Sequence, residues 1–291
     1  MFQYDFAMYA MGASVLVGVV CGLVGTFLVL RGFSLLGDAT GHATLPGVAA
    51  AFIIIGYQHP VALLVGALVS GGIGALTVGV LSRGPRVRSD AAIGIVLSVF
   101  FGIGVVMLAY IQQTATGQQA GLEQFLWGDA AAIAPGELTV LAAIGLVLCV
   151  LVILFFKPLA LMTFDEEFAR SAGLNTGSLE IGLLAALSVA VVVSIQAVGA
   201  VLVAAMLIIP PSTGRYLSGQ LVGVAAWAMG LGATSGAAGA YISYTYEGVA
   251  TGPAMVLVAT ALFVVASLFG PYGGVFTQRK RKPAAKTGGQ R

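Results

Sequence analysis

Between two long apolar runs the chain reads Leu35-Leu-Gly-Asp38-Ala-Thr-Gly-His42-Ala-Thr-Leu-Pro46-Gly47. Asp38 and His42 are four residues apart, so in a helix their side chains lie on one face within reach of a shared ligand. A charged side chain at the bilayer centre costs roughly 2.5 to 3.5 kcal/mol on insertion scales, so such residues usually face a bundle interior or a water-filled cavity. This pair is therefore a candidate binding site within an apolar protein.

The composition indicates a membrane protein. Of the 291 residues, 59% are hydrophobic and only 8% are charged, which leaves no room for a sizeable soluble domain. We expect an all-α, polytopic integral membrane protein of the cell membrane, with residues 1–275 forming one transmembrane domain. The first residues show no signal-peptide pattern, so the first apolar span should remain as an anchor. The basic segment 276–291 is expected to be a disordered cytoplasmic tail.

Long apolar runs predict eight or nine transmembrane helices. Seven spans are separated by polar breaks and are predicted at Met8 to Leu30, Leu35 to Tyr57, Val61 to Leu81, Ala91 to Ile111, Leu138 to Phe156, Leu221 to Tyr244 and Pro253 to Phe269. Residues 179–215 are long enough for two more spans with a turn near Ser194 to Gly199. The total is eight if the first segment is re-entrant or if residues 179–215 form one bent unit.

The basic residues predict the orientation of these spans. If the loop after Arg31 is cytoplasmic and the spans alternate, all 13 Lys and Arg residues lie on the cytoplasmic side, together with the C-terminus. Such an asymmetry is a strong positive-inside signal. With nine spans, the N-terminus is expected outside.

Glycines are expected to serve close helix packing, because lipid gives helices no hydrophobic drive to associate. The runs Gly71-Gly-Ile-Gly74 and Gly230-Leu-Gly232 are predicted contact faces of this kind. The chain contains no Gly-x-x-x-x-Gly-Lys-Ser/Thr loop, so we expect ATP hydrolysis, if any, on a separate subunit.

The loop from Lys157 to Ser178 is the most polar internal segment and is expected to contain a short helix at about residues 164–173. Acidic residues open this helix and Gly173 ends it, as expected for a capped helix with a glycine stop. The loop is the natural place to receive a cytoplasmic partner. An ordinary amphipathic interfacial helix is the alternative.

Five ordered blocks resemble the membrane subunits of the manganese/zinc/iron-type ABC importers. The blocks begin at Gly25 (GTFLVLR), Ser34 (SLLGDATGHATLPG), Ser89 (SDAAIGI), Phe164 (FDEEFARSAG) and Gln196 (QAVG, followed by MLIIP at 206–210). Their order and spacing cover nearly the whole chain. Two positions depart from the family pattern: Gly41 stands where Ser is usual, and Pro211-Ser212 replaces small residues.

The resemblance implies a permease subunit of an ATP-driven importer of Mn²⁺, Zn²⁺ or Fe²⁺, with no enzymatic chemistry and no cofactor. It implies that Asp38 and His42 line the translocation pathway and bind the ion transiently. The implied partners are a cytoplasmic ABC ATPase dimer, an extracellular metal-binding protein and a second permease copy, in surrounding lipid and without nucleic acid. The implied ATPase-coupling residues are Phe164, Glu166, Glu167, Phe168, Arg170 and Gly173.

The residues leave other interpretations open. Asp38 could cap the second helix near its N-terminus, while His42 bonds a neighbouring backbone group. An ion-coupled secondary metal carrier would need no ATPase, although no internal repeat typical of such carriers is evident. An intramembrane metalloenzyme is disfavoured, because His-Glu-x-x-His is absent and a third fixed ligand is missing.

Overall fold

The computed structural model describes residues 2–57, 59–84, 87–114, 135–246 and 248–277, and these residues form helices without strands. The helices are α1 (Phe2–Leu30), α2 (Leu36–Ile55), α3 (Pro60–Ser82), α4 (Ser89–Thr114), α6 (Pro135–Leu154), α7 (Phe156–Phe164), α8 (Glu166–Ser171), α9 (Thr176–Val198), α10 (Ala200–Leu217), α11 (Leu221–Thr245) and α12 (Thr251–Phe269). The predicted all-α class is confirmed. Most of the predicted tail, from residue 278 on, lies outside the described residues.

Eight helices in the described part of the chain are long and apolar enough to cross a membrane, which makes this a multi-pass membrane protein. Residues 179–215 divide into two helices, because α9 ends at Val198 and Gly199 adopts a positive φ of 86° before α10 begins. Helix α10 is the shorter of the two, with its apolar part at Leu202–Leu217. The chain therefore has eight long spans and one shorter apolar helix in its described residues.

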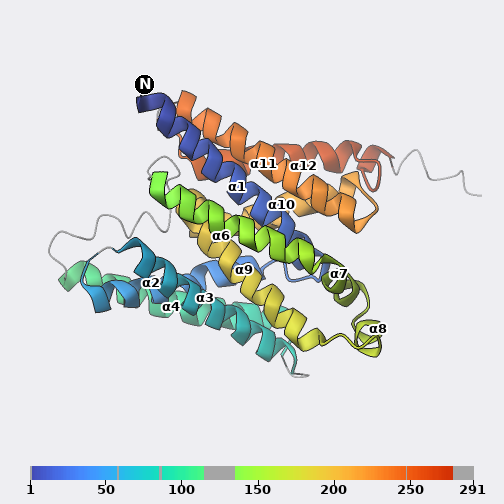
Figure 1. The fold of residues 1–291 in the computed structure, drawn as a ribbon, viewed down its shortest axis with the longest axis horizontal. Helices are drawn as coiled ribbons and strands as arrows, with labels where there is room; N and C mark the ends of the chain where they lie inside the picture. Colours follow the sequence, from blue (N-terminus) through green and yellow to red (C-terminus); the bar gives the residue numbers. More distant parts are fainter. Residues whose placement is uncertain (1, 58, 85–86, 115–134, 247, 278–291) are drawn as a thin grey trace, which may run out of the picture.

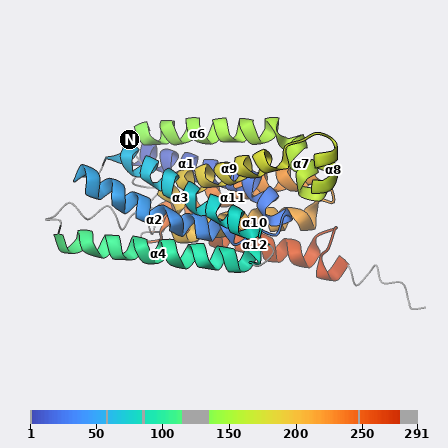
Figure 2. The same ribbon diagram turned by 90° about the horizontal axis from the view of Figure 1, so that it is seen from below.

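The helices form two groups joined by α9. In Figure 1, α1, α10, α11 and α12 lie on one side of the bundle, and α2, α3 and α4 lie on the other. Helix α9 packs against α1, α2, α3 and α10, and so connects the two groups. Figure 2 shows α6 and α4 at opposite edges of the same bundle.

The contact of α1 with α11 is made by small residues. A Cβ atom added to Gly18 would overlap the carbonyl of Gly232, and one added to Gly232 would overlap the carbonyl of Gly18. In lipid, helices associate through such close packing of small side chains. The two backbones therefore touch at this crossing.

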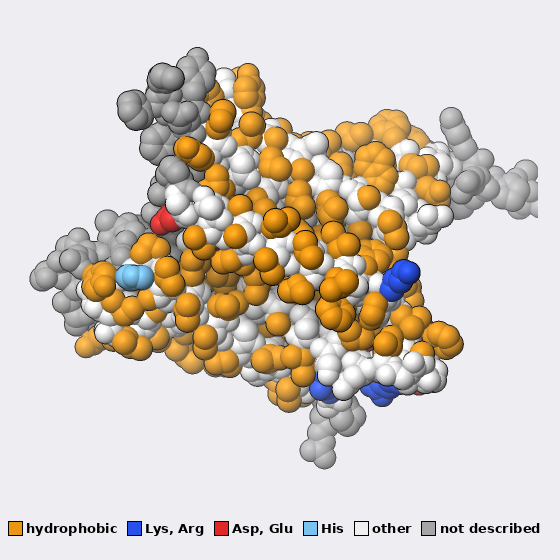
Figure 3. Space-filling model, in the orientation of Figure 1, with side chains coloured by type: hydrophobic (Ala, Val, Ile, Leu, Met, Phe, Trp, Pro, Cys, Tyr) orange, Lys and Arg blue, Asp and Glu red, His pale blue; other side chains and the backbone are white. Residues whose placement is uncertain are grey.

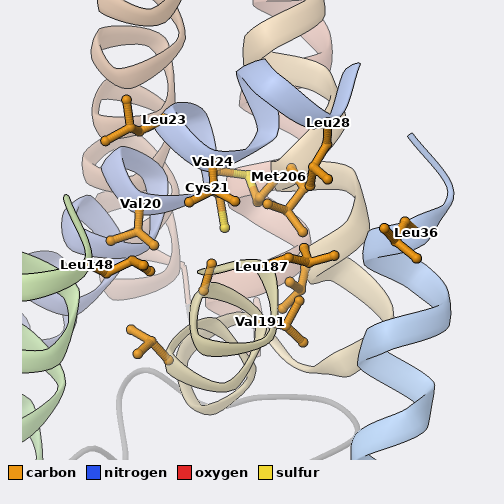
Figure 4. Close-up of a cluster of buried hydrophobic side chains, with 14 of the residues drawn as sticks. Val20, Cys21, Leu23, Val24, Leu28, Leu36, Leu148, Leu187, Val191 and Met206 are labelled. Carbon is orange, nitrogen blue, oxygen red and sulfur yellow. The ribbon is translucent and has the colours of Figure 1, made fainter. Parts of the chain in front are cut away.

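The core lies where α1, α9 and α10 meet (Figure 4). Val24 of α1, Leu187 and Val191 of α9, and Met206 of α10 are all almost completely buried there. The thiol of Cys21 lies 3.2 Å from the hydroxyl of Ser194 in this core. Helix α9 is thus fixed at the centre of the molecule, and the surrounding helices are positioned against it.

One end of the bundle carries the short helices. After α6, the chain turns into α7 and then α8, and the ring of Phe156 at the start of α7 meets the ring of Phe27 of α1 at 5.2 Å. In the space-filling view of Figure 3, the visible Lys and Arg side chains gather at this end, and a histidine lies toward the opposite end. Between the two ends the surface is predominantly apolar, as expected for a face in contact with lipid.

Candidate functional site

The turn between α1 and α2 determines where α2 begins, and so where Asp38 and His42 lie on that helix. Gly32 has a positive φ of 77°, its N–H donates to the carbonyl of Val29 at 3.3 Å, and the N–H of Phe33 donates to the carbonyl of Leu28 at 2.9 Å. These are the two hydrogen bonds of a Schellman motif, which ends a helix sharply. Helix α2 then begins at Leu36 and places Asp38 in its first turn.

The structure brings the Asp38 and His42 side chains together on one face of α2. The Nε2 atom of His42 lies 3.4 Å from Oδ1 of Asp38. The His42 side chain is 16% exposed and the Asp38 side chain 34% exposed, so both are only partly covered by the protein. The Nδ1 atom of His42 is buried and has no hydrogen-bond partner among the described residues.

This geometry does not match the capping alternative. The N-cap residue of α2 is Leu35, without a side-chain capping hydrogen bond, and the Asp38 carboxylate pairs with His42 instead. A buried imidazole nitrogen without a partner is unusual, because buried polar atoms are normally hydrogen-bonded. The pair therefore offers a carboxylate oxygen and one imidazole nitrogen to a ligand. No group of three or more possible metal ligands occurs in the described residues.

Helix α2 is held in place by a different face from the one that carries the pair. The hydroxyl of Ser70 on α3 donates to the carbonyl of Ala43 at 2.6 Å, and a Cβ added to Gly47 would overlap the Gly66 carbonyl. The polar face meets α4 instead, where the ring of Phe101 contacts the His42 ring edge-on at 4.9 Å between centroids. The fixed backbone of α2 thus presents the pair toward α4.

The predicted loop helix is present as α8, and it is shorter than the predicted range of residues 164–173. Asp165 is its N-cap residue, and its carboxylate accepts from the backbone N–H of Phe168 at 2.8 Å. Gly173 has φ 84° and forms the C-terminal Schellman motif: its N–H donates to Arg170, and that of Leu174 donates to Ala169, both at 3.0 Å. The acidic start and the glycine stop therefore have the physical roles expected of them.

The two phenylalanines of this region project outward from different helices. Phe164 is the last residue of α7 and is 67% exposed, and Phe168 lies in α8 and is 56% exposed. The two phenylalanines of the predicted ATPase-coupling residues are thus divided between two helices, because Asp165 interrupts the helix. Ala169 is fully buried and anchors α8 on the bundle.

An ion pair that no sequence pattern indicated connects α8 with the α1–α2 turn, and a second ion pair lies within α8. Nη2 of Arg31 lies 3.8 Å from one carboxylate oxygen of Glu166, and Nη2 of Arg170 lies 2.6 Å from the other. Arg31 and Glu166 are far apart in sequence, so no spacing pattern could reveal that they meet. Glu167 is exposed on the same short helix.

These features are those of a multi-pass membrane protein that has the Asp38–His42 pair on a membrane helix and a capped polar helix at one end. Residues 3–270 match the model of the ABC 3 transport family. The chain belongs to this family and is a membrane permease of the ABC type. This finding favours an ABC permease over an ion-coupled secondary carrier.

Similar proteins support the same family. The chain is 42% identical over 274 residues to the manganese transport system membrane protein MntC of Bacillus subtilis, covering 94% of this chain and 63% of that relative. It is 39% identical over 265 residues to the zinc transport system membrane protein TroC of Treponema pallidum, covering 91% and 89%. The structure of PsaBC from Streptococcus pneumoniae in complex with Fab superposes with a TM-score of 0.81 at 30% identity, covering 94% of this chain and 95% of that one.

Proposed function

We propose that the chain is the membrane permease of an ATP-driven importer of a divalent transition metal ion, Mn²⁺, Zn²⁺ or Fe²⁺. The observation that carries this proposal is the Asp38–His42 pair, with an imidazole nitrogen that has no partner in the described protein. Relatives that belong to manganese and zinc transport systems support the choice of cargo.

The donor set fits such a cargo. Carboxylate and imidazole suit Mn²⁺, Fe²⁺ and Zn²⁺, whereas a soft metal would favour thiolates. Two ligands from one chain hold an ion loosely, and a transport site must release its ion as readily as it takes it up. In a symmetric homodimer whose axis passes near α2, two such pairs would supply four ligands to one ion.

The direction of transport and the partners follow from the two ends of the bundle. In the alternating arrangement predicted from the sequence, all 13 Lys and Arg residues lie on one side of the spans, which supports a cytoplasmic location for that side and for the C-terminus. The chain contains no nucleotide-binding loop, so a cytoplasmic ABC ATPase supplies the energy. It docks on the end of α7 and on α8 through the exposed rings of Phe164 and Phe168, with Glu167 and Arg170 at the rim of the contact. An extracellular metal-binding protein delivers the ion at the opposite end.

Replacement of either member of the pair tests the pathway. We expect Asp38→Ala and His42→Ala each to reduce uptake of radioactive Mn²⁺ or Zn²⁺ to the level of cells without the permease, because each removes half of the donor set. Both variants should still insert in the membrane and co-purify with the ATPase, since neither side chain is fully buried.

The matched control is His59→Ala. His59 is the N-cap of α3, and its side chain accepts from the N–H of Ala62 at 3.4 Å, so this histidine has a capping role and does not belong to the Asp38–His42 pair. This variant should keep uptake close to the unmutated rate. Normal uptake by both pair variants would refute the pathway role, whereas loss of uptake by His59→Ala as well would mean that the assay reports general damage. Growth of a metal-uptake-deficient strain on each of the three metals identifies the cargo.

A further inference from the structure

Arg31 sits where α1, α2 and α8 come together, and its guanidinium has contacts in two directions. On one side, Nη2 lies 3.8 Å from Oε2 of Glu166 on α8. On the other, Nη1 lies 3.8 Å from the sulfur of Met162 on α7, and the guanidinium lies 5.6 Å from the centre of the Phe33 ring. The arginine side chain is only 12% exposed, so the guanidinium is held within the structure and not free in solvent.

The backbone between Arg31 and the polar pair is continuous and fixed. Arg31 is the residue that follows the last turn of α1, and the Schellman motif at Gly32 sets the direction of the chain after it. The N–H of Leu36 then donates to the carbonyl of Phe33 at 3.0 Å, and that of Ala39 to Leu35 at 3.2 Å. Leu36 is almost completely buried, so this turn cannot shift without moving the first turn of α2.

On the α8 side of the Arg31–Glu166 contact, Glu166 is also held in place by other residues. Glu166 uses one carboxylate oxygen for Arg31 and the other for Arg170, whose Nη2 lies 2.6 Å away. Arg170 in turn donates from Nε to the hydroxyl of Thr176 at 3.0 Å, at the start of α9. Glu166 is therefore the residue of α8 that connects this helix with the α1–α2 turn.

We propose that the Arg31–Glu166 ion pair transmits movement of α8 to the start of α2, and so makes the Asp38–His42 pair respond to the state of the ATPase. Arg31 is a positioning residue. It does not touch the ion, and it acts through residues 32–37, which connect it with Asp38. The long distance of the pair and the exposure of Glu166 suit a contact that breaks and reforms in each cycle. Met162 and Phe33 keep the guanidinium in place while Glu166 moves.

This inference rests on the proposed function, and the experiment separates the two. The permease with its ATPase is reconstituted in proteoliposomes, and metal transported per ATP hydrolysed is measured for Arg31→Gln, Glu166→Gln and the double variant. We expect each single variant to keep the ATPase bound and hydrolysing, and to lower the transport ratio by roughly 2- to 30-fold, the size found for members of coupling networks. The double variant should be no worse than either single one, because both remove the same interaction.

Arg83→Gln is the matched control. Arg83 is another arginine of the described residues with a carboxylate partner, since its Nη2 lies 2.8 Å from Glu180, but this pair joins α3 to α9 and does not involve α8. Its transport ratio should stay at the unmutated value. If Arg31→Gln does not accumulate, Glu166→Gln decides the case, because its side chain is 41% exposed and its loss leaves α1 intact.

Two outcomes would overturn the inference: an unchanged transport ratio in Glu166→Gln, or a loss of transport that is fully accounted for by loss of ATPase binding. Additive effects in the double variant would also count against it. If Asp38→Ala and His42→Ala transport normally, the proposed function fails. If Asp38→Ala and His42→Ala abolish transport while Glu166→Gln keeps the unmutated ratio of metal transported to ATP hydrolysed, the proposed function stands and only the role of the Arg31–Glu166 pair is refuted.

Discussion

Helices α1 and α11 touch backbone to backbone, whereas the polar face of α2 meets its neighbour α4 through side chains. The contact between α1 and α11, here called the seam, pairs small residues at intervals of four: Ser14 with Gly236, Gly18 with Gly232, and Gly22 with Ala228. At the polar face, Asp38 and His42 stay partly exposed, and the Phe101 ring lies beside His42. The seam has no room for a ligand, whereas at the polar face the buried Nδ1 atom of His42 has no hydrogen-bond partner among the described residues.

Because the two contacts differ, substitutions in the seam and at the polar face should have different consequences. In the seam, any added atom meets backbone, which cannot rotate away, so the helices must separate. At the polar face, and at the exposed surface of α8, a shortened side chain removes side-chain contacts such as that of His42 with Phe101 and leaves the backbone contacts of the bundle in place. We therefore expect changes in the seam to remove the folded protein, and changes at the functional surfaces to remove transport alone.

The largest effect is expected for Gly232→Val. The new side chain would overlap the Gly18 carbonyl, and overpacking of this kind costs about 1 to 3 kcal/mol or more. We expect little folded protein in the membrane, measured by the monodisperse peak of detergent-solubilised protein in size-exclusion chromatography. Gly230→Val is the matched control two residues away, because a Cβ at Gly230 has open space within 4 Å. Equal yields of the two variants would contradict the close packing of the seam.

A smaller and different effect is expected for Phe168→Asp. Phe168 is 56% exposed on α8, so the change should leave folding intact while it places a charge in the proposed contact with the ATPase. A tagged permease should pull down less ATPase and transport should stop, whereas Glu167→Gln, a change at the edge of the same helix, should have a modest effect. Retention of the ATPase and an unmutated transport rate in Phe168→Asp would move the coupling surface elsewhere, first to residues 83–90.

Much of this fold could be predicted from the sequence. The length of each apolar run must match the thickness of the bilayer, and the Lys and Arg residues of the loops collect on one side of it. The spacing of Asp38 and His42 was enough to place them on one face, since a helix repeats every 3.6 residues. The glycine signal was harder to interpret. Of the predicted contact face Gly230-Leu-Gly232, Gly232 lies in the seam as predicted, but Gly230 has open space around it. The seam follows Gly18-x-x-x-Gly22 and Gly232-x-x-x-Gly236, a small-residue spacing that was not recognised in the sequence.

Other features depend on tertiary contacts that no local pattern encodes. The start of α8 could be inferred from its acidic residues, but the break at Asp165 that places Phe164 on α7 depends on the extended backbone of that residue, with φ −150° and ψ 92°. The contact of Arg31 with Glu166 joins residues 135 positions apart. Such a pairing follows from where α7 and α8 fold back on α1, which a single sequence does not show.

The smallest effect is expected for Ser70→Ala, which tests whether the two faces of α2 are truly distinct. The Ser70 hydroxyl donates to the carbonyl of Ala43, the residue next to His42. Hydrogen bonds between membrane helices contribute about 0.6 kcal/mol on average, so the variant should unfold at a slightly lower temperature in detergent and keep its metal uptake.

Thr77→Ala on the same helix is the control for this last substitution, because the Thr77 hydroxyl donates to Ile73 within α3 and so links no two helices. Thr77→Ala should lower the unfolding temperature less than Ser70→Ala does. A folded Ser70→Ala variant that no longer takes up metal would contradict the division drawn here. In that case the face of α2 that packs on α3 would belong to the pathway, and the Ala43 carbonyl, freed from Ser70, would be the next atom to examine as a ligand.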